Sequence, residues 1–552
     1  MSTLHFVLFF FYLRFLMWDF IVVALYFAAI ISIGLYAGRK QASLEDYALG
    51  GRNLPWWAIL ASIIAAEISA ATFLGTPGEG FVLRNFTYVQ LCIGAVLGRI
   101  IVGKLFLKPY YDYKVVSIYE YLQLRFGIRT RRWASVTFLI SRVLASGVRL
   151  YFAGILLVIA YMAMVSQEAA SPMETVLIYI GALTLITVMT AIYTTLGGLK
   201  AVVWTDVLQA SILVLAVGTT ICLLFFTIKG DGSFAQAWST ICNSLGDAAA
   251  NPCGNETLQP GKVFDFGITG DGFVADVRYI LSSEYTLWTA FLGATFLAMA
   301  THGTDQDMVQ RMLAAKDSKT GTRAVILSGL VDVPVVLIFL VCGMLVFVYW
   351  DVVGMSLPVN AEGKVESMKI FPYFIIHHLP VGIRGLLVAA LLATAMGSLS
   401  TALNALATTA TRDWYRDVFN PRATEKQLLH AVRWMTVAFA VLLIAVGAVS
   451  AWYVVMNPSA RILPIALGIF GYTYGSLLGV FLLGMLTKNR GNDVGNIWAM
   501  LAGFAAVIAL EVLGNADLIV KIAFPWRVTI GTLVTFGVGC CFSGGRSVRQ
   551  RV

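Results

Sequence analysis

Charged residues are scarce in this sequence of 552 residues: they make up 12% of it, whereas hydrophobic residues make up 59%. Soluble domains carry about 25% charged residues, so this composition excludes a soluble globular protein. Short segments that alternate apolar and polar residues are also lacking, which excludes a membrane β-barrel. Apolar windows of about 20 residues recur from Trp18 almost to the C-terminus, and lipid requires such windows to be helices. The sequence therefore predicts an all-α polytopic membrane protein.

Sequence signatures of enzyme chemistry are missing as well. The chain has no zinc-type spacing of His and Cys, no phosphate-binding Gly-rich loop with Lys, and no nucleophile elbow. We expect neither an enzyme nor an organic cofactor. Without an ATP site, active transport would have to draw on an ion gradient.

Cysteine is rare, with seven residues in the whole chain. Most of them lie in apolar windows, where a small hydrophobic side chain is the ordinary reading. Cys242 and Cys253 instead lie in a long loop at residues 228–280. We expect that loop to be external, where the two thiols could form a disulfide in an oxidising compartment.

Hydropathy predicts about thirteen membrane spans in a single transmembrane domain of residues 18–543. Residues 1–17 are interpreted as an overcalled start or a flexible N-terminus, and residues 544–552 as a tail. The predicted spans are 18–38, 56–76, 86–107, 133–164, 173–196, 202–227, 285–305, 324–349, 381–411, 429–453, 462–486, 494–513 and 525–543.

Basic residues gather in alternate loops rather than spreading along the chain. Since cytoplasmic loops carry an excess of Lys and Arg, this pattern places the N-terminus outside and the C-terminus inside a plasma membrane. The basic clusters lie at residues 39–52, 108–132, 311–323, 412–426, 488–490 and 546–551.

Of the charged residues inside predicted spans, where a charge is costly and usually functional, four stand out: Glu67, Arg149, Asp206 and Asp332. Glu67 and Arg149 have opposite signs at similar depth, so they either pair with each other or bind a polar solute together. Asp332 has no evident partner, and we expect a structural role for it. Arg99, Lys104 and Arg142 lie nearer the span ends, where long side chains can reach the interface.

Two spans contain residues that suit an ion site. The segment 61–72 places Glu67 and small polar residues in mid-span, with helix-breaking Gly75 and Pro77 after them. In the second span, Thr394, Ser398 and Thr401 share one helical face that could present oxygen atoms to sodium. Small and hydroxyl residues also allow close helix packing, and spacing alone leaves both readings open.

Several motifs together resemble the sodium/solute symporter family over most of the chain. They are Gly75-Thr76-Pro77, Ser117-Ile118-Tyr119-Glu120-Tyr121-Leu122, Trp204-Thr205-Asp206, Asp305-Gln306-Asp307-Met308-Val309-Gln310-Arg311 and Ser398-Leu399-Ser400-Thr401-Ala402-Leu403-Asn404. The resemblance implies sodium-coupled symport of a small polar solute such as a sugar, organic acid or amino acid, by alternating access. It also implies a LeuT-like core of two inverted five-helix repeats, at about 56–227 and 285–486, after an extra N-terminal helix.

The same resemblance implies a set of site residues. A first sodium ion would be bound by the carbonyls of Ala65, Ile68 and Thr394 and the hydroxyl of Ser398. A second sodium ion would be bound by Asp206, Ser400 and Thr401. Solute contacts would come from Glu67, Ser69, Thr72 and Arg149. Many relatives have a hydroxyl residue where this chain has Gly397, which would weaken sodium binding.

Two alternatives remain open from the sequence. One is a proton-coupled carrier with Glu67 or Asp332 as the relay, and the other is a membrane sensor that binds solute without transporting it. The expected partners are a small solute, sodium and the lipid bilayer. We expect no nucleic acid and no obligate protein partner.

Overall fold

The computed structural model describes residues 3–39, 41–165, 171–247, 249–254, 258–359, 365–457 and 462–543. Within these ranges every secondary-structure element of more than one residue is a helix, and β-structure is limited to three isolated bridges. This confirms the all-α prediction. The predicted tail at 544–552 lies outside the described residues, whereas residues 3–17 belong to the same helix as the first predicted span.

The helices alternate between long spans and short connecting elements. The first half of the chain contains α1 (Thr3–Ala37), α2 (Leu44–Leu49), α3 (Trp56–Glu67), α4 (Ala70–Leu83), α5 (Leu91–Ile101), α6 (Leu107–Asp112), α7 (Tyr119–Arg125), α8 (Ile128–Val165), α9 (Pro172–Lys229) and α10 (Phe234–Gly246). The second half contains α11 (Phe273–Ser282), α12 (Thr295–Gly303), α13 (Gln306–Leu313), α14 (Ser318–Val353), α15 (Ser367–His378), α16 (Ile383–Thr409), α17 (Glu425–Met456), α18 (Ile462–Leu486), α19 (Gly495–Asn515) and α20 (Phe524–Cys540).

Each of the thirteen predicted spans coincides with helix, but their number as membrane spans is not confirmed. Of the described helices, nine are long and apolar enough to cross a membrane, or ten if a bent pair counts as one span. Two predicted spans lie in α9, which kinks at Gly198 with φ 54° and ψ −157°. Glycine adopts this backbone without the strain that a side chain would bring.

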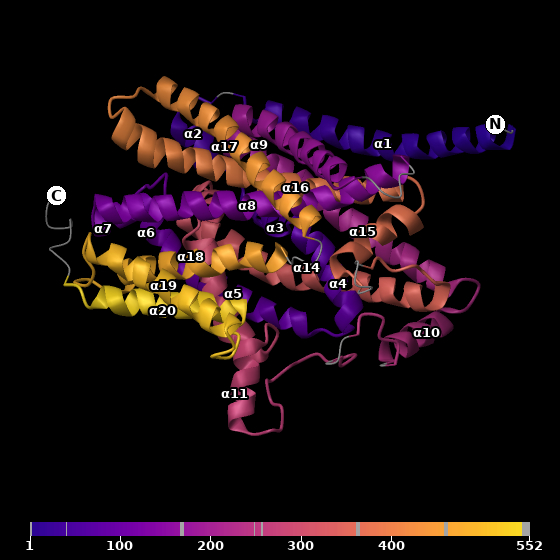
Figure 1. Ribbon diagram of the computed structural model, residues 1–552. Helices are drawn as coiled ribbons and strands as arrows, with labels where there is room; N and C mark the ends of the chain where they lie inside the picture. Colours follow the sequence, from indigo (N-terminus) through magenta and orange to yellow (C-terminus); the bar gives the residue numbers. More distant parts are fainter. Residues whose placement is uncertain are drawn as a thin grey trace.

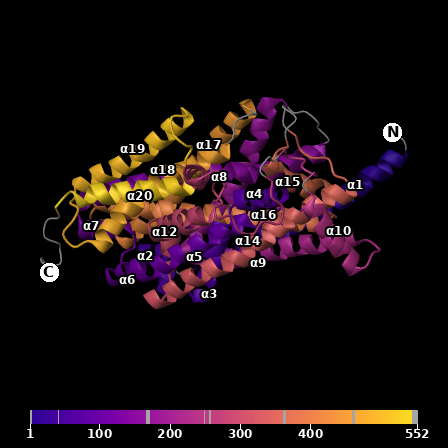
Figure 2. The same ribbon diagram turned by 90° about the horizontal axis from the view of Figure 1, so that it is seen from below.

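The long helices lie side by side as a bundle, with α8 and α16 in its interior and α19 and α20 at one edge (Figures 1 and 2). α16 packs against α1, α3, α8 and α9. The start of α1 and the end of α20 lie at opposite ends of the bundle, and α11 projects away from it (Figure 1).

Two pairs of consecutive helices, α3–α4 and α12–α13, are each separated by a two-residue break. α3 and α4 meet at Ile68 and Ser69 with a bend of 69°, as the polar segment predicted. α12 and α13 are separated by Thr304 and Asp305, and the Asp305 carboxylate caps α13 by accepting from the amide of Asp307 at 2.9 Å. This second break was not predicted. Interrupted helices release backbone groups that can bind ions or solutes.

The disulfide between Cys242 and Cys253 does not form, since both are free cysteines. Cys242 is exposed on α10, whereas Cys253 is partly buried against the hydrophobic core. The two thiols therefore face different surroundings, and the disulfide that the sequence left open is not formed.

Glycines let α4 and α14 approach each other closely. The carbonyl of Pro77 lies where a side chain at Gly343 would begin, and the carbonyl of Leu340 lies where one at Gly80 would begin. Small residues serve this purpose generally between membrane helices. The contact holds the second half of the broken pair α3–α4 against α14.

We predict that Gly343→Ala lowers the melting temperature of the purified protein, because the new methyl group overlaps the Pro77 carbonyl. Overpacking of this kind costs about 1–3 kcal/mol. Gly218→Ala is the matched control on α9, because no atom lies within 4 Å of its added methyl group. Equal melting temperatures for the two variants would contradict this packing.

Candidate functional site

The break between α3 and α4 changes which backbone groups are paired. The amide of Ser69 donates to the carbonyl of Glu67 at 2.9 Å, and no longer to that of Ala65, its usual acceptor in a continuous helix. Ile68, between the two helices, has non-helical ψ of 87°. The carbonyl of Ala65 is thus released at the break, as a sodium ligand requires.

An ion cluster at the break draws side chains from four helices. Glu67 of α3 pairs with Arg99 of α5 and lies 2.9 Å from His302 Nε2 of α12. Arg99 also contacts Asp332 Oδ2 of α14 at 2.5 Å and donates to Ser328 at 3.1 Å. One arginine therefore joins two carboxylates and holds the broken helix against α5 and α14.

This cluster corrects three expectations. Glu67 does not pair with Arg149, because Arg99 and His302 are its partners. Arg99 does not reach the interface, since its side chain is 2% exposed. Asp332 does have a partner, which is Arg99. Gly329 on α14 makes room for the arginine, since a side chain there would lie 3.1 Å from Arg99 Cδ.

A second buried network surrounds Asp206 of α9. Ser62 donates to Asp206 Oδ2 at 2.5 Å, and Arg311 Nε donates to Ser62 at 2.9 Å. Arg311 pairs with Asp307 at 3.0 Å and stands 3.9 Å from Asp206. The network joins α3, α9 and α13 to one another.

Arg142 extends this network to α8. It pairs with Asp305 at 3.2 Å and with Asp307, and its side chain is 5% exposed. It is buried in the bundle, so the expectation that it reaches the interface is wrong. Tyr474 of α18 also donates to Asp305.

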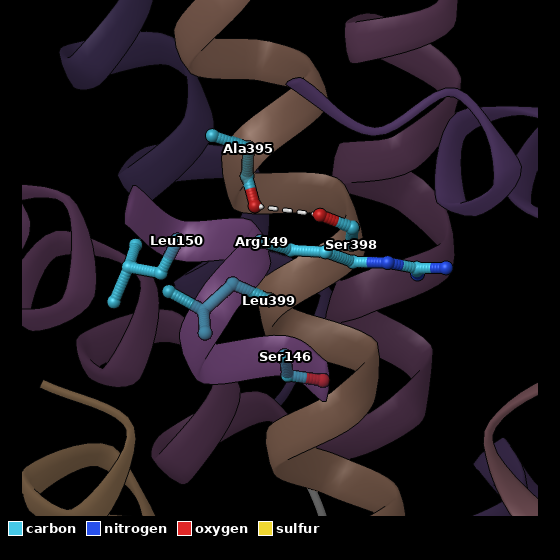
Figure 3. A pocket seen from close by; sticks show the side chains of 6 residues that line it. All are labelled: Ser146, Arg149, Leu150, Ala395, Ser398 and Leu399. Atoms are coloured by element: carbon cyan, nitrogen blue, oxygen red, sulfur yellow. Dashed lines mark hydrogen bonds between the residues drawn. The ribbon is translucent and has the colours of Figure 1, made fainter. Parts of the chain in front are cut away.

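Arg149 lies on α8 in a small pocket between α8 and α16 (Figure 3). The pocket has room for little more than a water molecule. Arg149 forms no ion pair with any residue that the structure describes, and its guanidinium stacks on the ring of Phe470 at 4.7 Å. In Figure 3 its side chain extends across α16 beside Ser398. The pocket is lined by Ser146, Arg149, Leu150, Ala395, Ser398 and Leu399.

The hydroxyl groups of α16 donate to carbonyls of their own helix. Thr394 donates to Leu391 at 2.8 Å and Ser398 to Ala395 at 3.1 Å. Ser400 and Thr401 both donate to the carbonyl of Gly397, at 3.0 and 3.2 Å. Because the protons are used within the helix, the oxygen lone pairs remain available to a cation.

The predicted residues separate into distinct groups. Ala65 and Asp206 meet α16 at Gly397, while Ser398 shares the pocket of Arg149. Ser69 and Thr72 lie together at the start of α4, with 3.4 Å between their hydroxyl oxygens. Glu67 belongs to the ion cluster. Sequence reasoning missed Arg99 and His302 as its partners, although the polar run His302-Gly303-Thr304-Asp305 after an apolar window signals the second break.

Known sodium-coupled transporters are similar to this chain over most of its length. The model of the sodium:solute symporter family matches residues 47–503. The sodium/sialic acid symporter NanT of Aliivibrio fischeri is 26% identical over 94% of this chain and 92% of its own length. The human sodium-coupled monocarboxylate transporter 1 is 27% identical over 89% of this chain and 72% of its own length.

A solved structure has the same LeuT-like fold. It is a Na+-coupled sialic acid symporter in a substrate-bound, outward-open state, with a TM-score of 0.74 and 23% identity. The match covers 96% of this chain and 99% of the solved one.

We predict that Arg99→Met destabilises the protein by about 3 kcal/mol, the lower end for a buried pair, because Glu67 and Asp332 are only partly buried when they lose their shared counter-ion. Adding Asp332→Asn to this variant recovers part of the loss, since fewer unpaired carboxylates then remain. The measurement is the melting temperature in detergent.

Lys521→Met is the control, because it breaks an exposed pair with Asp517 that is worth at most about 1 kcal/mol. Equal melting temperatures for the Arg99→Met and Lys521→Met proteins would show that the cluster does not stabilise the break.

Proposed function

The chain belongs to the sodium:solute symporter family, and we propose that it carries a small solute bearing a carboxylate across the plasma membrane together with sodium. Family membership makes it a sodium-coupled symporter that works by alternating access. That the solute bears a carboxylate does not follow from family membership. We infer it from the pocket of Arg149.

A half-buried guanidinium without a counter-ion among the described residues supports this choice of solute. Glu67 is the other charged residue predicted to touch solute, and it is already engaged by Arg99 and His302. Arg149 has no ion pair among the described residues and lines the pocket with Ser146 and Ser398. Guanidinium groups bind carboxylates through paired hydrogen bonds, and the hydroxyl of Ser146 can donate a further one. A carboxylate solute would compensate the charge.

The names of several relatives agree with an acidic solute, whereas a relative from sheep is named sodium/glucose cotransporter 1. Relatives from two bacteria are sodium/sialic acid symporters, and relatives from human and mouse are sodium-coupled monocarboxylate transporters. We propose that Ser69 and Thr72 bind the polar remainder of the solute from the start of α4. Glu67 then positions the break through Arg99.

We propose that sodium binds where the break meets α16. The first site would use Ala65, Ile68, Thr394 and Ser398, and the second Asp206, Ser400 and Thr401. The released carbonyl of Ala65 supports the first, and the buried carboxylate of Asp206 supports the second. Sodium bound there would link α3 to α16 and favour one orientation of the broken helix.

We further propose that the core consists of two inverted repeats at about 56–227 and 285–486. Each repeat would contain one of the two breaks, at Ile68 and at Thr304. The N-terminus would lie outside and the C-terminus inside, because the basic loops then face the cytoplasm.

We predict that Arg149→Gln weakens the binding of carboxylate solutes about 10- to 100-fold, the loss expected for a hydrogen bond to a charged group. The assay is thermal stabilisation of purified protein by sialic acid, short monocarboxylates and neutral glucose, in sodium and in potassium buffer. An acid should stabilise the unmodified protein in sodium.

Arg129→Gln is the matched control, since Arg129 is an exposed arginine on the same helix. It should bind acids as the unmodified protein does. Normal acid binding by a folded Arg149→Gln protein, or a preference for glucose, would contradict the carboxylate assignment.

A further inference from the structure

The segment that leads into α11 exposes its apolar side chains and buries its acidic one. Phe264, Phe266 and Ile268 are exposed, whereas Asp265 and Gly267 between them are buried. A loop that faces water would be arranged the other way round, because burying a carboxylate and exposing aromatic rings to water are both costly. The alternation therefore indicates that something other than water covers this segment.

Contacts with α11 explain why the acidic residue is turned inward. Asp265 accepts a hydrogen bond from the hydroxyl of Tyr279 at 2.7 Å and pairs with Lys262 at 3.1 Å. Gly267 lies directly against α11, since a side chain there would begin 2.4 Å from Ile280 Cγ1. The segment is thus held along α11 by its buried face, and its exposed rings are left on the outside.

α11 has an exposed apolar face of its own. Phe273, Val274 and Val277 are neighbours on the surface of this helix, because residues four apart lie one above the other. All three are exposed, and no large hydrophobic side chain in the described part of the chain is more exposed than Phe273, at 82%. Arg278, the next residue, is exposed as well. Apolar residues bordered by a basic one are typical of a helix that lies in a membrane surface.

The end of α11 is fixed at the level where two membrane helices end. The carbonyls of Ile280 and Leu281 accept hydrogen bonds from the Trp526 indole at 3.0 Å and from the Ala523 amide at 2.8 Å. Ala523 immediately precedes α20, and α19, which is long and apolar enough to cross a membrane, ends shortly before it at Asn515. Span ends and tryptophan side chains mark the boundary between hydrocarbon and water.

α11 runs across the bundle rather than along it. Figure 1 shows α19 and α20 lying along the bundle, with α11 leaving it sideways near the start of α20. Because membrane helices lie near the bilayer normal, a helix that crosses their direction lies in the plane of the membrane. At the level of the start of α20, that plane is the boundary between acyl chains and headgroups.

We propose that α11 and residues 263–269 form a membrane anchor that lies in the lipid interface around the start of α20. Its exposed rings would rest among the acyl chains, and Arg278 would reach the headgroup phosphates. The apolar face continues toward Trp288 and Phe291, which follow α11 in the chain, begin the next predicted span and are about half exposed. The inference goes beyond the proposed function, since it does not depend on which solute is carried.

Photocrosslinking of the full-length protein in phospholipid vesicles tests the anchor. The photoreactive amino acid p-benzoylphenylalanine replaces Phe273 in one variant, Ile268 in a second, and Lys426 in a control. Lys426 is an exposed residue of a basic cluster, so we expect it in water. After illumination in vesicles of phosphatidylcholine and phosphatidylglycerol, mass spectrometry gives the fraction of chains that carry a lipid. Both anchor positions should carry on the order of tenfold more lipid than position 426, because their side chains lie among acyl chains.

The outcomes separate lipid from the other possible occupants of this face. Melting temperatures of the three variants should equal that of the unmodified protein, because each replaced side chain is exposed. Chains cross-linked to one another through position 273 or 268 would mean that a second copy covers the face, and would overturn the anchor. Lipid labelling as low as at position 426 would overturn it too, since the face would then lie in water. Neither result bears on acid symport, which is tested separately at Arg149.

Discussion

The interruption of a membrane helix at Ile68 is the constraint on which the rest of the site depends. Inside a bilayer, backbone groups have no water to bind, so every group released by a break needs a partner from the protein or from a ligand. The shift of the Ser69 amide to Glu67 releases the carbonyl of Ala65. That carbonyl faces α16 at Gly397, where the structure also places Asp206 and Gln209. A break of this kind costs stability unless something binds there, which is how ion binding and helix orientation become linked.

The buried charges form two networks on either side of this break. Arg99 joins Glu67 to Asp332 and fixes the broken helix to α5 and α14. Arg311 and Arg142 fix the second break through Asp305 and Asp307 and leave Asp206 under-compensated. Arg149 has the opposite imbalance, since it is a cation without a counter-ion among the described residues. The surroundings of Asp206 thus lack a cation, and those of Arg149 lack an anion. Bound sodium would balance the first charge, and a bound acid the second.

Much of the fold followed from the sequence, because apolar windows of about 20 residues leave few choices in lipid. The break at Glu67–Ser69 was predicted for the same reason, from polar residues in the middle of such a window. The partners of the buried charges were not predicted. Glu67 and Arg149 lie at similar depth in their spans, but depth does not determine which helix faces which. Arg99 reaches Glu67 because α5 packs closely against α14 at Gly329, which has no side chain to keep the two helices apart. The neighbours of Gly397, among them Gln209 and Ala65, were not predicted either, since they come from helices distant in the sequence.

The central claim is that sodium and an acidic solute bind to one protein state and stabilise each other's binding. Linkage requires that if sodium raises solute affinity by some factor, solute raises sodium affinity by the same factor. The direct measurement is a pair of titrations on the same purified protein: solute affinity with and without sodium, and sodium affinity with and without solute. The account predicts equal factors, both well above one. Solute affinity that stays the same in sodium and in potassium would contradict it.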